Sequence, residues 1–219
     1  MIKTVLFDLD GTLLDTLDDL TVAVNVALEE KGFSLRTRAE IQSFVGNGFK
    51  KLLERAVPAK TEESVILECL NRFSEYYTNH LMVKTKPYDG VIKALEDLKK
   101  EGYQIGVVSN KRDDAAKTVC DFYFGNCLDC VVGESDTVKR KPYPDTVQFA
   151  LETLNTKLED AILLGDSTVD YETSKNAKIR FLAVTWGFRT KEELQNAGVT
   201  EFIESTDQIV SAIVQKDKG

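Results

Sequence analysis

The sequence predicts an α/β fold with a doubly wound, Rossmann-like parallel sheet and an all-helical insertion after the first strand. Three observations indicate this fold. From about residue 87 onwards, short apolar runs typical of buried strands alternate with helical repeats. Between Asp15 and Leu81 the apolar residues follow helical spacing without any strand pattern. One further apolar run, Lys3–Asp8, precedes that stretch, so the sheet is expected to begin before the insertion.

The elements follow from these patterns in chain order. After the first strand, helices are predicted over residues 17–28, from Thr37 onwards, and over 49–57 and 62–81. The helix at Thr37 is indicated by Thr37-Arg38-Ala39-Glu40, which has the form of a capping box. Strands are then expected at 104–108, 128–132, 161–164 and 181–184, with a short edge strand at 201–203. Helices are expected at 90–101, from Asp113, over 144–155 and at the C-terminal end. The predicted domains are 1–14 with 84–219, and 15–83.

The composition is that of an ordinary soluble globular protein. The 219 residues include 28 Lys and Arg against 36 Asp and Glu, a net charge of −8. This balance argues against partners such as nucleic acid or an anionic membrane, which bind basic surfaces. No apolar run approaches the roughly 20 residues of a membrane span, and the N-terminus does not resemble a signal peptide, so a cytoplasmic location is expected.

Histidine and cysteine restrict the possible chemistry further. His80 is the single histidine, which excludes two-histidine zinc sites. Cys127 and Cys130 form a C-x-x-C pair, which suits half a zinc site, a redox pair, or two small buried residues on a strand. The last interpretation is favoured, because the other candidate ligands are scattered along the chain.

Polar residues follow three predicted strands, at the edge where α/β sheets bind ligands. They are Asp8-Leu9-Asp10-Gly11-Thr12, Ser109-Asn110-Lys111 and Gly165-Asp166-Ser167-Thr168-Val169-Asp170, and Lys141 precedes the helix at Pro144. Carboxylates gathered in one crevice repel one another unless a cation lies among them, and oxygen ligands favour Mg²⁺. Carboxylates, Mg²⁺, a lysine and a hydroxyl suit phosphoryl transfer. The absence of a G-x-x-x-x-G-K-[ST] loop disfavours a P-loop kinase or ATPase.

These motifs resemble, in order and along the whole chain, those of the haloacid dehalogenase-like phosphatases. The D-x-D-G-T motif stands at Asp8–Thr12, the hydroxyl motif at Ser109, the lysine motif at Lys141–Asp145 and the final acidic motif at Gly165–Asp170. Two further stretches, Val45-Gly46-Asn47-Gly48 and Thr185-Trp186-Gly187-Phe188-Arg189, are similar to the phosphoglycolate phosphatase branch. The resemblance implies that the helical insertion is a small cap domain.

The resemblance also implies roles for individual residues. Asp8 would attack phosphorus and form an aspartyl phosphate, and Asp10 would protonate the leaving oxygen and later activate water. Ser109 and Lys141 would hold the phosphoryl oxygens. Mg²⁺ would be bound by Asp8, the Asp10 carbonyl and Asp166, with Asp170 in support. The substrate-binding candidates are Thr12, Asn110, Gly46, Asn47 and Gly48, although Gly46–Gly48 suits a plain turn equally well.

The implied function is a Mg²⁺-dependent phosphomonoester hydrolase for a small phosphorylated metabolite, with phosphoglycolate as the first candidate. One alternative is a sugar phosphomutase of the β-phosphoglucomutase type, which would use basic residues such as Arg36, Arg38, Lys50, Lys51 and Arg55. Another is a pyrophosphate or nucleotide phosphatase. The expected assembly is a monomer or a homodimer.

Some residues of the chain depart from the family pattern or are expected only to pack. Arg112 follows Asn110-Lys111 where relatives usually have Pro, and Lys178 stands where a helix-ending Gly is usual. Trp186 is expected to pack near the site, and His80 to end a helix.

Overall fold

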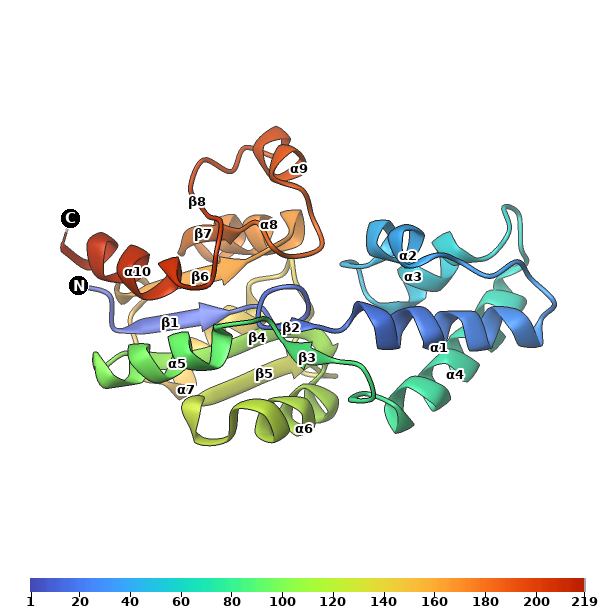
Figure 1. Cartoon of the computed structure of the whole chain (residues 1–219), viewed down its shortest axis with the longest axis horizontal. Helices are drawn as coiled ribbons and strands as arrows, with labels where there is room; N and C mark the ends of the chain where they lie inside the picture. Colours follow the sequence, from blue (N-terminus) through green and yellow to red (C-terminus); the bar gives the residue numbers. More distant parts are fainter. Residues whose placement is uncertain (219) are drawn as a thin grey trace. The chain divides into compact units, whose positions relative to one another are not determined.

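The computed structural model describes residues 1–218, which divide into two compact units (Figure 1). The α/β unit combines Met1–Asp15 with the chain from Pro87 onwards, and the helical unit is Thr16–Lys86. The chain leaves the α/β unit after β2 (Leu14–Asp15) and returns to it through β3 (Lys86–Pro87), and β2 and β3 pair with each other. That the helical unit acts as a cap stays a prediction.

A six-stranded parallel sheet forms the centre of the α/β unit, in the order β5-β4-β1-β6-β7-β8. The strands are β1 (Thr4–Phe7), β4 (Gln104–Arg112), β5 (Cys130–Glu134), β6 (Ala161–Gly165), β7 (Arg180–Val184) and β8 (Phe202–Ile203). The chain builds outward from β1 in both directions, which confirms the predicted doubly wound fold. The central strands β1 and β6 are buried along their whole length, as parallel strands covered on both faces require.

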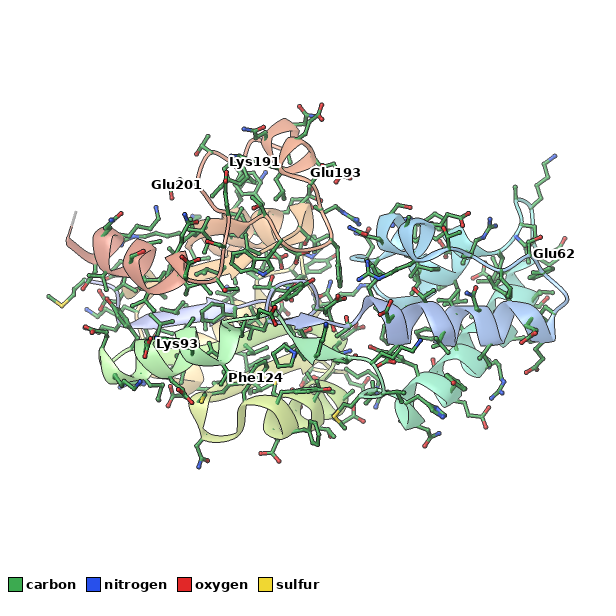
Figure 2. The ribbon with its side chains drawn as sticks, viewed as in Figure 1. Glu62, Lys93, Phe124, Lys191, Glu193 and Glu201 are labelled. Atoms are coloured by element: carbon green, nitrogen blue, oxygen red, sulfur yellow. The ribbon has the colours of Figure 1, made fainter. Side chains whose placement is uncertain are left out.

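Helices cover both faces of the sheet (Figure 1). They are α5 (Val91–Lys100), α6 (Asp113–Phe124), α7 (Asp145–Thr153), α8 (Thr168–Ala177), α9 (Lys191–Asn196) and α10 (Gln208–Lys218), with short 3₁₀ turns η1 (Gly125–Cys127) and η2 (Leu158–Asp160). Helices α7 and α8 share one apolar cluster with strand residues such as Leu6 and Leu163, and α5 contacts α10. Side chains fill the space between these layers, among them Phe124, which ends α6 and is buried (Figure 2).

The helical unit contains α1 (Leu17–Glu30), α2 (Arg38–Phe44), α3 (Phe49–Ala56) and α4 (Glu63–Asn79). The predicted capping box forms at the start of α2, where Thr37 and Glu40 bond reciprocally. An aromatic cluster of Phe49, Phe73 and Tyr77, with ring centroids 4.9–5.5 Å apart, joins α3 to α4. His80 caps the C-terminus of α4, as predicted. No helix among residues 1–218 is both long and apolar enough to cross a lipid bilayer.

Two local predictions need correction or completion. The strand predicted at 128–132 begins at Cys130, so Cys127 lies in η1 and the two cysteines do not share a strand. Both are half-buried free thiols. Lys178 ends α8 in the left-handed conformation (φ 58°, ψ 33°) that a glycine would adopt without strain. A side chain there costs about 1 kcal/mol, which the helix tolerates.

Candidate active site

The strand register brings the polar strand ends together. Phe7, the last residue of β1, pairs with Val107 of β4 on one side and with Leu164 of β6 on the other. The residues that follow are therefore level with one another at one edge of the sheet. This edge carries Asp8 just after β1, Ser109 from β4 and Asp166 just after β6, as the sequence patterns predicted.

Lys141 links the carboxylates of this edge. Its Nζ lies 2.6 Å from Asp8 Oδ1 and 2.6 Å from Asp170 Oδ1, and it also donates to the carbonyl of Val108 at 3.1 Å. The side chain is 3% exposed. Asn110 fixes the loop that carries the lysine, because its amide oxygen accepts from Lys141 N (2.6 Å) and its amide nitrogen donates to Lys141 O (3.1 Å). These contacts give Asn110 a structural task, and its predicted contact with substrate stays a prediction.

Asp166 is held from two sides. Its Oδ1 accepts from the Thr12 hydroxyl at 3.1 Å, and its Oδ2 accepts from the backbone N–H of Phe188 at 2.7 Å. The chain approaches this carboxylate so closely that a Cβ on Gly187 would lie 2.3 Å from the Cβ of Asp166. Gly11, at φ +96°, would likewise bring a Cβ within 2.4 Å of Asp166 Oδ2. The glycines thus allow two loops to close around one acid.

Asp170 uses both carboxylate oxygens within the site. Oδ2 accepts from the backbone N–H (3.1 Å) and hydroxyl (2.6 Å) of Ser167, completing the capping box that opens α8. Oδ1 contacts Lys141. Asp170 therefore fixes the lysine and the start of α8, and its predicted support of a metal ion stays a prediction.

The three buried acids form a group suited to a metal ion. Asp8, Asp166 and Asp170 each offer an oxygen within 4.8 Å of the others, and all three are buried. Burial raises the pKa of Asp8 well above its usual value; Asp170 raises it further and Lys141 lowers it. Burial and the charge of Asp170 raise the pKa of Asp166 to about 7. Burial lowers the pKa of Lys141, but Asp170 and Asp8 outweigh it, so that pKa is raised.

A divalent cation fits this group of residues. Three carboxylates face one ammonium, so the buried cluster carries excess negative charge that a cation would neutralise. Buried carboxylate oxygens are the ligands of hard cations such as Mg²⁺. Asp8 and Asp166 would supply side-chain oxygens to such an ion.

Asp10 lies apart from the acidic cluster. Its side chain is 24% exposed, and its Oδ1 is 3.3 Å from Nζ of Lys111. The turn that carries it is closed by the Gly11 N–H, which donates to the carbonyl of Leu14 at 2.8 Å. The Asp10 carboxylate is thus not part of the group formed by Asp8, Asp166 and Asp170.

Ser109 and Trp186 complete the surroundings of the acids. The buried Ser109 hydroxyl oxygen accepts from the backbone N–H of Lys111 at 3.1 Å. Trp186 donates from Nε1 to the carbonyl of Thr12 at 3.1 Å, so it supports the Asp8–Thr12 loop as expected of a packing residue. Lys111 and Phe188 both lie in stretches that the sequence singled out, but no role was predicted for the Lys111 side chain or for the Phe188 N–H. The period of two along a strand could have indicated that Lys111 follows Ser109 on the same side.

The Gly46-Asn47-Gly48 stretch connects α2 to α3 within the helical unit. Both glycines have positive φ, +112° and +82°. Arg55 holds the segment by donating to the carbonyl of Phe44 at 2.7 Å and to Asn47 Oδ1 at 3.2 Å. Its predicted role in binding substrate stays a prediction.

Known proteins resemble this chain along nearly its whole length. The sequence profile of the haloacid dehalogenase-like hydrolases matches residues 5–184. A phosphoglycolate phosphatase from Aquifex aeolicus is 33% identical over 187 residues, 85% of this chain and 86% of its own. A provisionally named pyrophosphatase from Caldanaerobacter subterraneus is 34% identical over 214 residues, 97% of this chain and 94% of its own.

A solved structure shows the same fold. The crystal structure of a provisionally named phosphoglycolate phosphatase from Lactobacillus delbrueckii superimposes with a TM-score of 0.93 at 30% identity, covering 96% of this chain and 98% of its own. The sequence profile, the relatives and the fold agree with one another. The chain therefore belongs to the haloacid dehalogenase-like hydrolase family and is a phosphatase.

Proposed function

We propose that the protein hydrolyses a phosphate monoester of a small metabolite through an aspartyl phosphate on Asp8, with Mg²⁺ as its cofactor and phosphoglycolate as its substrate. One observation carries this proposal: the Asp8 carboxylate is held 2.6 Å from Lys141 within a buried group of acids. An acid that is fixed by a cation and shielded from water is prepared to act as a nucleophile.

In the first half of the reaction, Asp8 attacks phosphorus and the bond from phosphorus to the ester oxygen breaks. Asp10 gives its proton to the departing oxygen, which leaves as an alcohol. The Lys141 ammonium and the Ser109 hydroxyl stabilise the charge on the phosphoryl oxygens. The product on the protein is the phosphoryl ester of Asp8.

In the second half, Asp10 takes a proton from a water molecule that attacks the same phosphorus. The bond between phosphorus and the Asp8 oxygen breaks, which releases inorganic phosphate and restores both carboxylates. Asp8, the carbonyl of Asp10 and Asp166 would hold Mg²⁺, which would supply electrostatic stabilisation of the phosphoryl oxygens. Thr12 and the Phe188 N–H keep Asp166 in place for that purpose.

Pyrophosphate is the second candidate substrate. The observation that favours it is the similarity to the provisionally named pyrophosphatase from Caldanaerobacter subterraneus, which extends over 97% of this chain. The same residues would serve, because phosphate replaces an alcohol as the leaving group.

The phosphomutase alternative gains no support from the helical unit. The basic residues suggested for gripping a second phosphate each contact a partner within that unit. These contacts are Arg36 with Glu40, Arg38 with Asp18, Lys50 with Glu63, Lys51 with Glu54, and Arg55 with Phe44 and Asn47. With β-glucose 1-phosphate and a trace of the bisphosphate, a mutase would form glucose 6-phosphate without equivalent phosphate release.

The decisive experiment measures phosphate released from a panel of phosphorylated metabolites and pyrophosphate, with Mg²⁺ and with EDTA. We expect the highest kcat/KM for phosphoglycolate, loss of activity in EDTA and recovery on adding Mg²⁺. A higher kcat/KM for pyrophosphate would favour the second candidate. Activity that is indifferent to the chelator would contradict the role given to Mg²⁺.

We also propose a cytoplasmic location. All four cysteines are free thiols, a state that reducing compartments maintain.

A further inference from the structure

A second buried lysine lies beside the proposed active site, and no step described so far uses it. Lys111 is on β4, two residues beyond Ser109, and its side chain is 2% exposed. Removing an ammonium from water costs several kcal/mol, which only a well-placed partner offsets. Its Nζ lies 3.3 Å from Oδ1 of Asp10.

The backbone of β4 explains how the lysine reaches this place. The ladder between β4 and β5 changes register between Val108 and Arg112, the stretch that contains Ser109 and Lys111. Such irregularities redirect side chains near active sites. The Lys111 N–H donates to the Ser109 hydroxyl oxygen at 3.1 Å, so the two residues are fixed together.

The Asp10 carboxylate has two different sides. Oδ1 is buried and receives no hydrogen bond from residues 1–218, whereas the side chain as a whole is 24% exposed. The exposed part of the carboxylate is therefore on the Oδ2 side. Because Oδ1 faces the Lys111 ammonium, that charge restrains the carboxylate and leaves Oδ2 to exchange a proton.

Cys120 of α6 is a titratable side chain near this pair. Burial raises the pKa of its thiol to about 12, with Asp10 raising it and Lys111 lowering it. The thiol is thus neutral near pH 7 and does not compete with Asp10 for the ammonium.

We propose that Lys111 is a positioning residue for Asp10: its ammonium holds Oδ1 so that Oδ2 is presented to the leaving oxygen. This inference rests on the proposed function, in which Asp10 protonates that oxygen. It concerns the first half of the reaction, which kcat/KM reports when formation of the aspartyl phosphate is irreversible.

If Lys111 positions the proton donor, its loss should affect esters with different leaving groups unequally, whereas the loss of a purely structural residue should affect them alike. Proton donation matters most when the leaving oxygen is strongly basic, and least when the oxygen departs readily as a stable anion. Phenyl phosphate and p-nitrophenyl phosphate have almost the same shape, but phenolate is the more basic leaving group. Loss of Lys111 should therefore impair hydrolysis of phenyl phosphate more.

The experiment compares kcat/KM for both esters in the full-length wild type, Lys111→Met and Lys111→Arg, with Mg²⁺ present. Lys111→Met is expected to lower kcat/KM for phenyl phosphate about 10- to 100-fold. The factor by which it lowers kcat/KM for p-nitrophenyl phosphate should be several times smaller. Lys111→Arg should recover part of the loss because it restores the charge. The matched control is Lys117→Met, an exposed lysine of α6 that pairs with Asp113 at 2.6 Å and should leave both values unchanged.

Thermal unfolding of each variant separates folding from positioning, and Lys111→Gln replaces Lys111→Met if the latter is unfolded. An equal loss for both esters, without recovery in Lys111→Arg, would overturn the inference and leave the proposed function intact. A wild-type protein that hydrolyses no phosphate ester would contradict the proposed function itself.

Discussion

The two units of the molecule differ in the charged groups that they bury. In the α/β unit, Lys141 contacts two carboxylates, and all of these groups are buried. In the helical unit, ion pairs such as Lys50–Glu63 and Arg38–Asp18 join side chains that are about half exposed. Exposed pairs contribute little to stability, whereas buried charges cost solvation. A contribution to stability therefore does not explain why Lys141 and its carboxylate partners are buried, whereas a role in the reaction does.

One buried acid of the helical unit refines this contrast. Asp19 accepts hydrogen bonds from the backbone N–H groups of Val83 (3.1 Å), Lys84 (3.0 Å) and Thr85 (2.8 Å), and from the Thr85 hydroxyl (2.8 Å). Its partners are uncharged groups, and each of them donates a hydrogen bond to the carboxylate. The acids around Lys141 instead face one another, so burial with like charges distinguishes the candidate site from a structural acid.

The largest expected effect is that of Asp8→Asn, which should lower kcat roughly 10⁴- to 10⁶-fold, as loss of a group in other covalent hydrolases does. The same change removes one of three repelling carboxylates, so the metal-free protein should unfold at a higher temperature. Phosphate release and thermal unfolding in EDTA measure the two effects. Retained turnover would disprove the nucleophile assignment.

Lys141→Met should destabilise the metal-free protein by about 3–5 kcal/mol, because it leaves buried carboxylates without their cation. The matched change in the helical unit, Lys50→Met, removes an exposed pair and should cost about 1 kcal/mol or less. Chemical denaturation in EDTA compares the two. Similar losses in both variants would remove the distinction between the units.

The metal-free protein should lose stability as the pH rises from about 4 to about 7. The pKa of Asp166 is about 7 in the folded protein, against 3.8 for an ordinary aspartate. Between these values the folded state binds more protons than the unfolded state, so the free energy of unfolding falls with rising pH. The loss amounts to a few kcal/mol, since one pKa unit corresponds to about 1.4 kcal/mol.

Urea denaturation in EDTA across this range checks the prediction, and Asp166→Asn is its control, because the variant lacks the titrating group. Added Mg²⁺ should restore most stability at the upper end of the range, where the acids are ionised. Stability that rises steadily with pH in EDTA would contradict the assignment.

The smallest expected effect lies in the helical unit. Asp19→Ala should cost about 2 kcal/mol, because buried backbone N–H groups lose a charged acceptor. Asp18→Ala removes the neighbouring exposed acid that pairs with Arg38 and should cost less than about 1 kcal/mol. Chemical denaturation compares the two variants. Equal costs would show that burial does not decide the contribution of an acid in this unit.

Much of the fold was predictable because its signals are local. Apolar runs and helical spacing identified β1, β4, β6 and β7, and the Thr37–Glu40 capping box lies at the start of α2 where it was expected. The start of β5 was not predicted correctly, because Cys127 and Leu128 are as apolar as the strand itself. Apolar character alone does not show where a 3₁₀ turn ends and a ladder begins.

The sequence by itself determined which acids and which hydroxyl lie towards the carboxyl ends of the strands, and parallel strands place those ends at one edge. It did not determine which of those groups lie together in the structure. Tertiary structure decided that Asp8, Asp166 and Asp170 share a buried cluster while Asp10 faces Lys111. It also brought the Phe188 N–H to Asp166. These contacts join residues far apart in the chain, and strand register and loop closure, which no local pattern encodes, set their distances.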